Sequence, residues 1–136
     1  MTKKKILVVD DAADTRLVVS TLLKKHQYDT AFAADAMQAI AVARQTQPDA
    51  IILDLGLPGG SGFIVLQRLK SNTTLSSIPV IILTADESPE SEFKGLEAGA
   101  AAFLHKPVQE EALITAVKCA VGVVEECPIT DAELRR

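Results

Sequence analysis

Five polar side chains stand directly after, or a residue or two beyond, short apolar runs in this sequence of 136 residues. They comprise three carboxylates, a hydroxyl and an ammonium: Asp10, Asp11, Asp54, Thr84 and Lys106. Carboxylates that converge repel one another strongly unless a cation lies among them. Such oxygen ligands suit Mg²⁺, which keeps some of its waters and accepts phosphate oxygens. The residue types therefore predict a magnesium site that serves phosphoryl chemistry.

The same residues divide naturally into chemical roles. A carboxylate beside a metal can attack phosphorus and form an aspartyl phosphate. The ammonium of Lys106 and the metal would neutralise the oxygens of the transferring group, and the Thr84 hydroxyl can donate to one of them. Each residue alone has a structural interpretation, because an Asp pair can cap a helix and a lone Asp can belong to a turn. Their joint position after strands favours the chemical interpretation.

Three apolar runs are typical of buried strands: Ile6–Val9, Ile51–Leu53 and Val80–Leu83. They do not alternate with polar residues, which indicates a parallel sheet covered on both faces. Two weaker strands are expected over Asp29–Ala33 and Ala101–Leu104. The site would lie beyond the carboxyl ends of these strands, where ligands bind in open α/β sheets.

Helical patterns fill the intervals between the strands. Asp35 is expected to cap a helix with Gln38 as its capping-box partner, and Pro89 suits the first position of another helix. The first helix is expected to bury a stripe of Leu17, Val18, Thr21 and Leu22. The five predicted helices cover residues 13–25, 36–45, 61–70, 88–99 and 109–124. Five alternating β-α units predict an open, doubly wound α/β fold with right-handed crossovers.

Composition limits the class of protein. Apolar residues make up 48% and charged residues 24%, so one globular domain is expected over residues 1–127, with a short polar tail over residues 128–136. The net charge of −4 argues against a broad nucleic-acid surface. No apolar stretch approaches the roughly 20 residues of a membrane span, and no secretory leader is recognisable. Cys119 and Cys127 are expected to be reduced thiols, so we expect a cytoplasmic protein.

Five separated motifs resemble the receiver domain of two-component response regulators, in particular the chemotaxis regulators. The resemblance covers Lys4 to about Val124 and implies a flavodoxin-like sheet with the strand order 2-1-3-4-5. The matching motifs are Ile6-Leu7-Val8-Val9-Asp10-Asp11, Asp54-Leu55-Gly56-Leu57-Pro58-Gly59-Gly60-Ser61-Gly62, Leu83-Thr84-Ala85, Gly99-Ala100 through Phe103, and Lys106-Pro107.

The resemblance implies a role for each acidic residue. Asp54 is the expected phosphoacceptor. Asp11 is expected to bind Mg²⁺ directly, Asp10 mainly through water, and Gly56 through its backbone carbonyl. Gly56 and Asp86 also occupy positions that, by resemblance, tune the lifetime of the phosphoryl group.

The resemblance also implies a switch. Thr84 would bind a phosphoryl oxygen, Lys106 would pair with phosphate, and the bond from Lys106 to Pro107 is expected to be cis. Phe103 matches an aromatic residue that swings inward when Thr84 moves, which changes the surface of the fourth helix, fifth strand and fifth helix. Phe103 is equally consistent with an ordinary core aromatic residue, and both interpretations remain open at this point.

The expected partners follow from these roles. A sensor histidine kinase or a histidine phosphotransfer protein would supply the phosphoryl group, and a downstream effector protein would bind the switched surface. Neither nucleic acid nor membrane is expected, and catalysis is limited to self-phosphorylation and autodephosphorylation. Ala101 and Ala102 replace acidic residues of relatives that dimerise through charge pairs, so we expect a monomer or weak dimer. If the chain is complete, its output must be a protein contact.

Three other classes of protein share part of this pattern. A dehalogenase-type phosphatase needs a second aspartate two residues after the first, where this chain has Ala12. In a flavodoxin-like electron carrier, Asp10 and Asp11 would repel the flavin phosphate. A degenerate receiver that binds partners without phosphorylation remains the alternative. His26 and His105 are expected to be exposed structural histidines.

Overall fold

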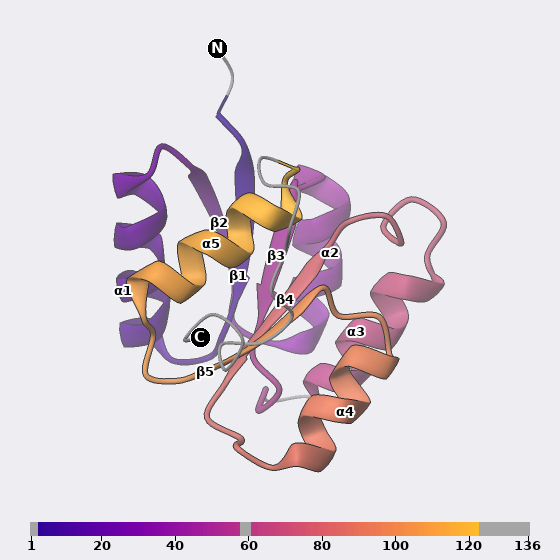
Figure 1. Ribbon diagram of the computed structural model, residues 1–136. Helices are drawn as coiled ribbons and strands as arrows, with labels where there is room; N and C mark the ends of the chain where they lie inside the picture. The colour runs from indigo at the N-terminus through magenta and orange to yellow at the C-terminus, as the bar shows by residue number, and fades with distance from the viewer. Residues whose placement is uncertain (1–2, 58–60, 123–136) are drawn as a thin grey trace.

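Five parallel strands form one sheet in the order β2-β1-β3-β4-β5 (Figure 1). The computed structural model describes residues 3–57 and 61–122. The strands are β1 (Lys5–Val9), β2 (Asp29–Ala33), β3 (Ala50–Leu53), β4 (Val80–Thr84) and β5 (Ala102–His105). Both the α/β class and the strand order predicted from the sequence are confirmed.

Five helices alternate with these strands and cover the sheet on both faces (Figure 1). α1 and α5 pack on one face, and α2, α3 and α4 pack on the other. The helices are α1 (Ala13–Lys25), α2 (Ala36–Thr46), α3 (Gly62–Ser71), α4 (Pro89–Glu97) and α5 (Glu110–Ala120).

The central strands are buried on both sides, as their unbroken apolar sequences predict. In β1, Ile6 and Val8 belong to the core beneath α1 and α5, whereas Leu7 and Val9 belong to the core beneath α2 and α3. The pairing of Val9 with Leu53 aligns the carboxyl ends of β1 and β3. The residues that follow β1 and β3 therefore lie next to each other at that edge of the sheet.

The helix starts follow the capping signals of the sequence. The Asp35 side chain accepts the backbone N–H of Gln38 at 2.8 Å. The Gln38 side chain accepts the N–H of Ala34 at 2.9 Å, one residue before the partner that a standard capping box uses. Ser88 caps α4 immediately before Pro89. These contacts satisfy backbone donors that a helix start otherwise leaves unpaired.

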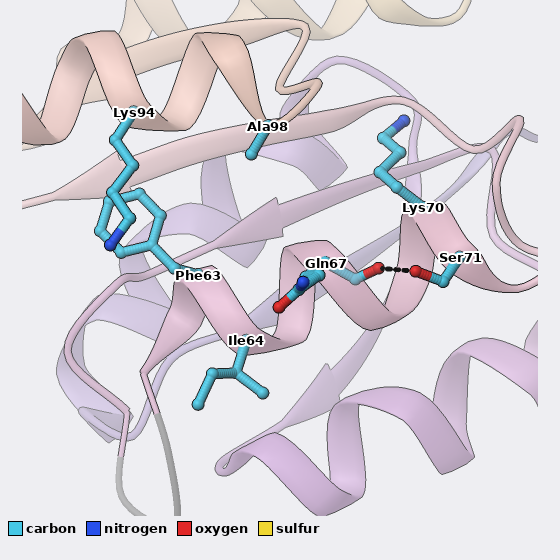
Figure 2. Close-up of a pocket in the computed structure, with 7 residues that line it drawn as sticks. All are labelled: Phe63, Ile64, Gln67, Lys70, Ser71, Lys94 and Ala98. Carbon is cyan, nitrogen blue, oxygen red and sulfur yellow. Dashed lines mark hydrogen bonds between the residues drawn. The ribbon is translucent and has the colours of Figure 1, made fainter.

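α3 and α4 contact each other on the face of the sheet that α2 also covers. The Lys94 ammonium of α4 lies 4.5 Å from the centroid of the Phe63 ring of α3 (Figure 2). Gly95 of α4 faces the sheet, where an added Cβ would lie 2.8 Å from Ile82 and 3.2 Å from the Phe103 ring. α4 therefore packs directly on the side chain expected to act as a switch.

The predicted buried stripe of α1 was wrong except for Leu22, which is half-buried against the core beneath α1 and α5. Leu17 and Val18 are 67% and 47% exposed, and Thr21 is also exposed, whereas Val19, Ser20 and Leu23 are buried. Val19 and Leu23 pack into the core beneath α1 and α5, and Arg16, three residues before Val19, donates to the carbonyl of Asp10 at 2.6 Å.

Two other predictions need correction. α5 ends at Ala120 rather than continuing to Val124, because Val121 leaves the helix and Gly122 has a positive φ of 84°. His26 is half-buried rather than exposed, since it contacts Glu110 at 3.0 Å, and His105 is half-buried against Phe103.

Some predictions lie outside the described residues. These are the polar tail over residues 128–136, Cys127 and the motif residues Pro58, Gly59 and Gly60. Among the helices that the structure describes, none has the length and apolar character needed to cross a membrane.

Candidate functional site

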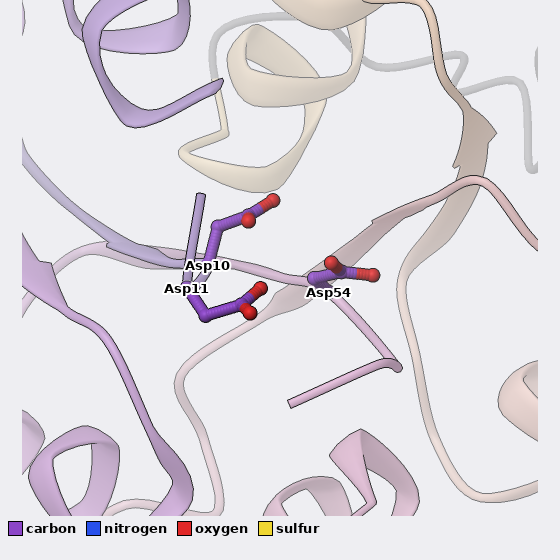
Figure 3. Close-up of side chains that lie close together, drawn as sticks. All are labelled: Asp10, Asp11 and Asp54. Carbon is purple, nitrogen blue, oxygen red and sulfur yellow. The ribbon is translucent and has the colours of Figure 1, made fainter. Parts of the chain in front are cut away.

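The three aspartates predicted to form the site come together at one rim of the sheet (Figure 3). One carboxylate oxygen from each of Asp10, Asp11 and Asp54 lies within 4.8 Å of the others. Asp10 and Asp11 follow β1, and Asp54 follows the neighbouring strand β3. Asp10 and Asp54 are only 3% and 8% exposed, whereas Asp11 faces solvent.

Lys106 connects the two buried carboxylates. Its Nζ lies 2.8 Å from Asp10 Oδ2 and 3.1 Å from Asp54 Oδ2. Burial lowers the pKa of the Lys106 ammonium, but the hydrogen bonds and charges of Asp10 and Asp54 outweigh burial, so the pKa rises above its usual 10.5. The lysine is therefore charged at neutral pH and offsets part of the repulsion between the aspartates.

Backbone groups hold the second oxygen of each buried carboxylate. Asp10 Oδ1 accepts the N–H of Ala12 at 2.9 Å, and Asp54 Oδ1 accepts the N–H of Gly56 at 3.2 Å. Asp11 extends the acidic cluster on its solvent side. The geometry thus fixes Asp10 and Asp54 between a cation and backbone donors.

Thr84 and Phe103 occupy the interior beside this rim. Thr84 ends β4 with 3% exposure, and its hydroxyl accepts the N–H of Asp86 at 3.3 Å. Phe103 is fully buried, and its ring lies edge-on to His105 at 5.4 Å. The buried ring is consistent with both a core aromatic and an inward switch residue, so the switch role stays a prediction. The Lys106–Pro107 bond is cis.

The donor set fits Mg²⁺ rather than a softer metal. All the ligands offered by Asp10, Asp11 and Asp54 are carboxylate oxygens, and no His or Cys joins the cluster among the described residues. Hard oxygen donors with an open solvent side match the preference of Mg²⁺ for a partly hydrated coordination shell. Gly56 is exposed beside them, although its carbonyl as a ligand remains a prediction.

Two residues that position the site were not predicted from the sequence. Arg16 holds the Asp10 carbonyl, and no local pattern points to that contact. Gly62 starts α3 against the site strand: an added Cβ there would lie 2.4 Å from the Asp54 carbonyl oxygen and 2.6 Å from Leu55 Cα. The available signal is a glycine directly after the helix-capping residue Ser61.

An α/β sheet of order 2-1-3-4-5 with this acidic rim and a lysine after the last strand defines a class of signalling domain. Residues 6–118 match the family model of the response regulator receiver domain. The chain therefore belongs to the response regulator receiver family of two-component signalling.

Curated relatives agree with this assignment. Protein PilH of Pseudomonas aeruginosa is 32% identical over 87% of this chain and 98% of PilH. Response regulator PleD of Caulobacter vibrioides is 37% identical over 97% of this chain. This chain spans only 30% of the length of PleD, so the activity of that whole protein does not transfer to it.

Solved structures show the same fold. Chemotaxis response regulator CheY4 of Vibrio cholerae has a TM-score of 0.81 and 32% identity, with coverage of 88% of this chain and 99% of the CheY4 chain. The receiver domain of the Francisella response regulator 1452 has a TM-score of 0.81 and 29% identity, over 88% of this chain and 97% of that chain.

Proposed function

We propose that this receiver accepts a phosphoryl group on Asp54 from the phosphohistidine of a sensor histidine kinase or histidine phosphotransfer protein. The observation that carries the proposal is the contact of Lys106 with both Asp10 and Asp54, inside a cluster completed by Asp11. A buried carboxylate that is oriented by a backbone N–H and an ammonium is placed to act as a nucleophile.

In the proposed reaction, a carboxylate oxygen of Asp54 attacks phosphorus while the bond from phosphorus to the donor histidine nitrogen breaks. The electron pair of that bond leaves with the imidazole. Lys106 stays within reach of the transferred group and offsets its added charge. Mg²⁺ bound by Asp10, Asp11 and Asp54 would supply further neutralisation of the phosphoryl oxygens. Asp54 thereby becomes an aspartyl phosphate.

Thr84 and Phe103 would then convert the new charge into a change of surface. The Thr84 hydroxyl, which now accepts from Asp86, would instead donate to a phosphoryl oxygen. Phe103 packs beneath Gly95 of α4, so a shift of its ring would be felt by that helix. The proposed output is a changed affinity of the α4-β5-α5 surface for a downstream effector protein.

The proposed setting is cytoplasmic signalling, with catalysis confined to phosphorylation and dephosphorylation of Asp54 itself. We propose a monomer or weak dimer that binds neither nucleic acid nor membrane directly. The net charge of −4 and the exposed Ala101, in place of an acidic pairing residue, support these proposals.

Intact-mass measurement after incubation with acetyl phosphate tests the proposal. We expect a gain of one phosphoryl group that requires Mg²⁺ and is absent in Asp54→Asn. Asp14→Asn is the matched control, because Asp14 is an exposed aspartate in the first turn of α1 and lies outside the cluster. No gain in the unmodified protein under any condition would instead favour a degenerate receiver that binds partners without phosphorylation.

A further inference from the structure

Two hollows border the exposed side of α3. One, of about 470 Å³, lies between α3 and α4, and the other, of about 440 Å³, lies between α2 and α3. Gln67 and Ser71 line both hollows, so the two form one surface. We call it the α2–α3–α4 face, and its lining residues are Ile40, Arg44, Phe63, Ile64, Gln67, Arg68, Lys70, Ser71, Asn72, Lys94 and Ala98. Figure 2 shows the residues that line the hollow between α3 and α4.

This face is positively charged on an acidic molecule. Its lining includes four cations, Arg44, Arg68, Lys70 and Lys94, and no carboxylate. α2 and α3 contain no Asp or Glu, and the sequence has none from residue 55 to residue 85. The whole chain has a net charge of −4. α4, which borders the face, also carries Glu90, Glu92 and Glu97. The positive potential is therefore concentrated over α2 and α3, at Arg44 and Arg68.

Three of these cations lack an internal acidic partner. Within residues 3–57 and 61–122, no carboxylate forms an ion pair with Arg44, Arg68 or Lys94, and all three side chains are exposed. Lys70 differs, because its Nζ donates to the carbonyls of Ser76 and Ile78 at 3.3 Å each. Arg68 and Lys94 are therefore available to a carboxylate from outside.

Apolar surface lies among these charges. Ile64 is 43% exposed on α3, and the half-buried Phe63 ring lies beneath the Lys94 ammonium at 4.5 Å (Figure 2). A solvent-exposed contact between a cation and a ring is weak. Lys94 could exchange it for an ion pair with an incoming carboxylate, which would uncover the ring for an apolar side chain.

We propose that the α2–α3–α4 face binds an acidic amphipathic segment of another protein. Apolar side chains of that segment would cover Ile64 and Phe63, and its carboxylates would pair with Arg68 and Lys94. Charge complementarity selects an acidic partner, and the exposed apolar residues favour an amphipathic protein segment over nucleic acid. The face does not include Asp54, so this binding does not require the proposed phosphorylation.

The test is an NMR titration of the isotope-labelled full chain. The titrant is a synthetic amphipathic helical peptide of about 16 residues. Its apolar face carries Leu and its polar face carries Glu. The comparison probes are the same peptide with Lys in place of Glu, and a short DNA duplex. The test variant combines Arg68→Glu with Lys94→Glu. The matched control is Lys24→Glu, since Lys24 is exposed on α1, on the other side of the sheet.

We expect the acidic peptide to cause saturable shifts in α2, α3 and α4. Affinity should fall roughly tenfold in the double variant and stay unchanged in Lys24→Glu. Thermal unfolding confirms that each variant is folded. Asp54→Asn should bind the peptide normally, which separates this proposal from that of phosphoryl transfer.

Five results would overturn the proposal. The first four are no saturable shifts on this face, equal binding of the Lys peptide, equal binding of DNA, and unchanged affinity in the double variant. Equal binding of DNA would identify the face as a general polyanion surface. The fifth is a set of shifts that depend on protein concentration without peptide and that vanish in the double variant, which would identify a second copy of this chain as the occupant instead.

Discussion

Lys106 contacts two of the three clustered carboxylates, at 2.8 Å from Asp10 and 3.1 Å from Asp54. A buried acidic pair without a cation is strongly unfavourable, because both groups have lost water and repel each other. The same contact orients Asp54 for attack on phosphorus. Stability of the rim and its proposed chemistry therefore rest on one side chain.

Lys106→Met should lower both the stability of the folded protein and the phosphoryl uptake of Asp54. The substitution keeps much of the side-chain volume but leaves Asp10 and Asp54 facing each other, which should cost about 1–3 kcal/mol of unfolding free energy. Urea unfolding at neutral pH measures the loss, and Lys24→Met is the exposed control. Phosphoryl uptake from acetyl phosphate should be lost as well. Unchanged stability and unchanged phosphoryl uptake would show that the contact of Lys106 with Asp10 and Asp54 contributes to neither.

At the scale of elements, the start of α3 is pressed against the strand that carries the phosphoacceptor. Gly62→Ala would bring a Cβ to 2.4 Å from the Asp54 carbonyl and 2.6 Å from Leu55 Cα, and rigid backbone cannot yield easily. We expect a loss of about 3 kcal/mol or more in unfolding free energy. Gly56→Ala should be tolerated, because a Cβ there meets nothing within 4 Å. Equal stability of the two variants in chemical denaturation would contradict this packing.

The end of α1 and the start of α5 are joined by an ion-pair cluster. Glu110 Oε2 lies 2.8 Å from Lys25 Nζ and 3.0 Å from His26 Nε2. The hydrogen bond from Lys25, and next that from His26, lowers the pKa of Glu110 below its usual 4.5. A lowered folded-state pKa means stabilisation above pH 4.5 that is lost as the pH falls through the folded-state value.

Glu110→Gln should therefore lower stability at neutral pH and have little effect at an acidic pH below the folded-state pKa of Glu110, where the carboxyl is protonated in both states. The effect should be small, because the cluster is exposed to solvent and salt screens it. Urea unfolding at both pH values measures it. Glu111→Gln is the control, because Glu111 is also in the first turn of α5 and has no ion pair with the described residues. A deficit that persists at low pH would rule out this charge effect.

Most element positions could be predicted from local patterns, but the side that α1 buries could not. The unbroken apolar runs located β1, β3 and β4 within a residue or two, because short apolar runs are typical of strands buried on both faces. α1 has apolar residues on two sides, and the side with Leu17 and Val18 was predicted to be buried. The structure buries the other side, with Val19 and Leu23 in the core beneath α1 and α5, and the sequence of the helix alone does not distinguish the two.

At the scale of the whole molecule, two cores share one sheet. Strands β1, β3 and β4 contribute alternate residues to the core under α1 and α5 and to the core under α2 and α3. Neither core can persist without the strands that also build the other. The two halves are therefore expected to unfold together.

Leu66→Ala tests this coupling. Leu66 of α3 is fully buried in the core on that face of the sheet, so its truncation should cost about 2–5 kcal/mol in unfolding free energy. Tyr28 is the single tyrosine of a chain without tryptophan, and it lies in the opposite core. Its fluorescence and the far-ultraviolet circular dichroism should shift to the same lower urea midpoint in the variant. A Tyr28 transition that stays in place would mean that the cores unfold separately.

The site was predictable because parallel strands bring their carboxyl ends to one rim. Asp10, Asp11 and Asp54 could thus be placed together from their positions after apolar runs. The sequence could not show that Lys106 selects Asp10 and Asp54 rather than Asp11, since side-chain direction and burial decide that. Nor could it reveal the positive α2–α3–α4 face, whose cations come from three helices.

The most direct test of the central claim is to locate the phosphoryl group on the chain. After incubation with acetyl phosphate and Mg²⁺, borohydride reduces an acyl phosphate of aspartate to homoserine, which peptide mass spectrometry can assign to a residue. We predict homoserine at position 54 and aspartate at positions 10 and 11. Homoserine at Asp10 or Asp11 with Asp54 unchanged, or aspartate at all three positions, would contradict the assignment of Asp54 as the phosphoacceptor.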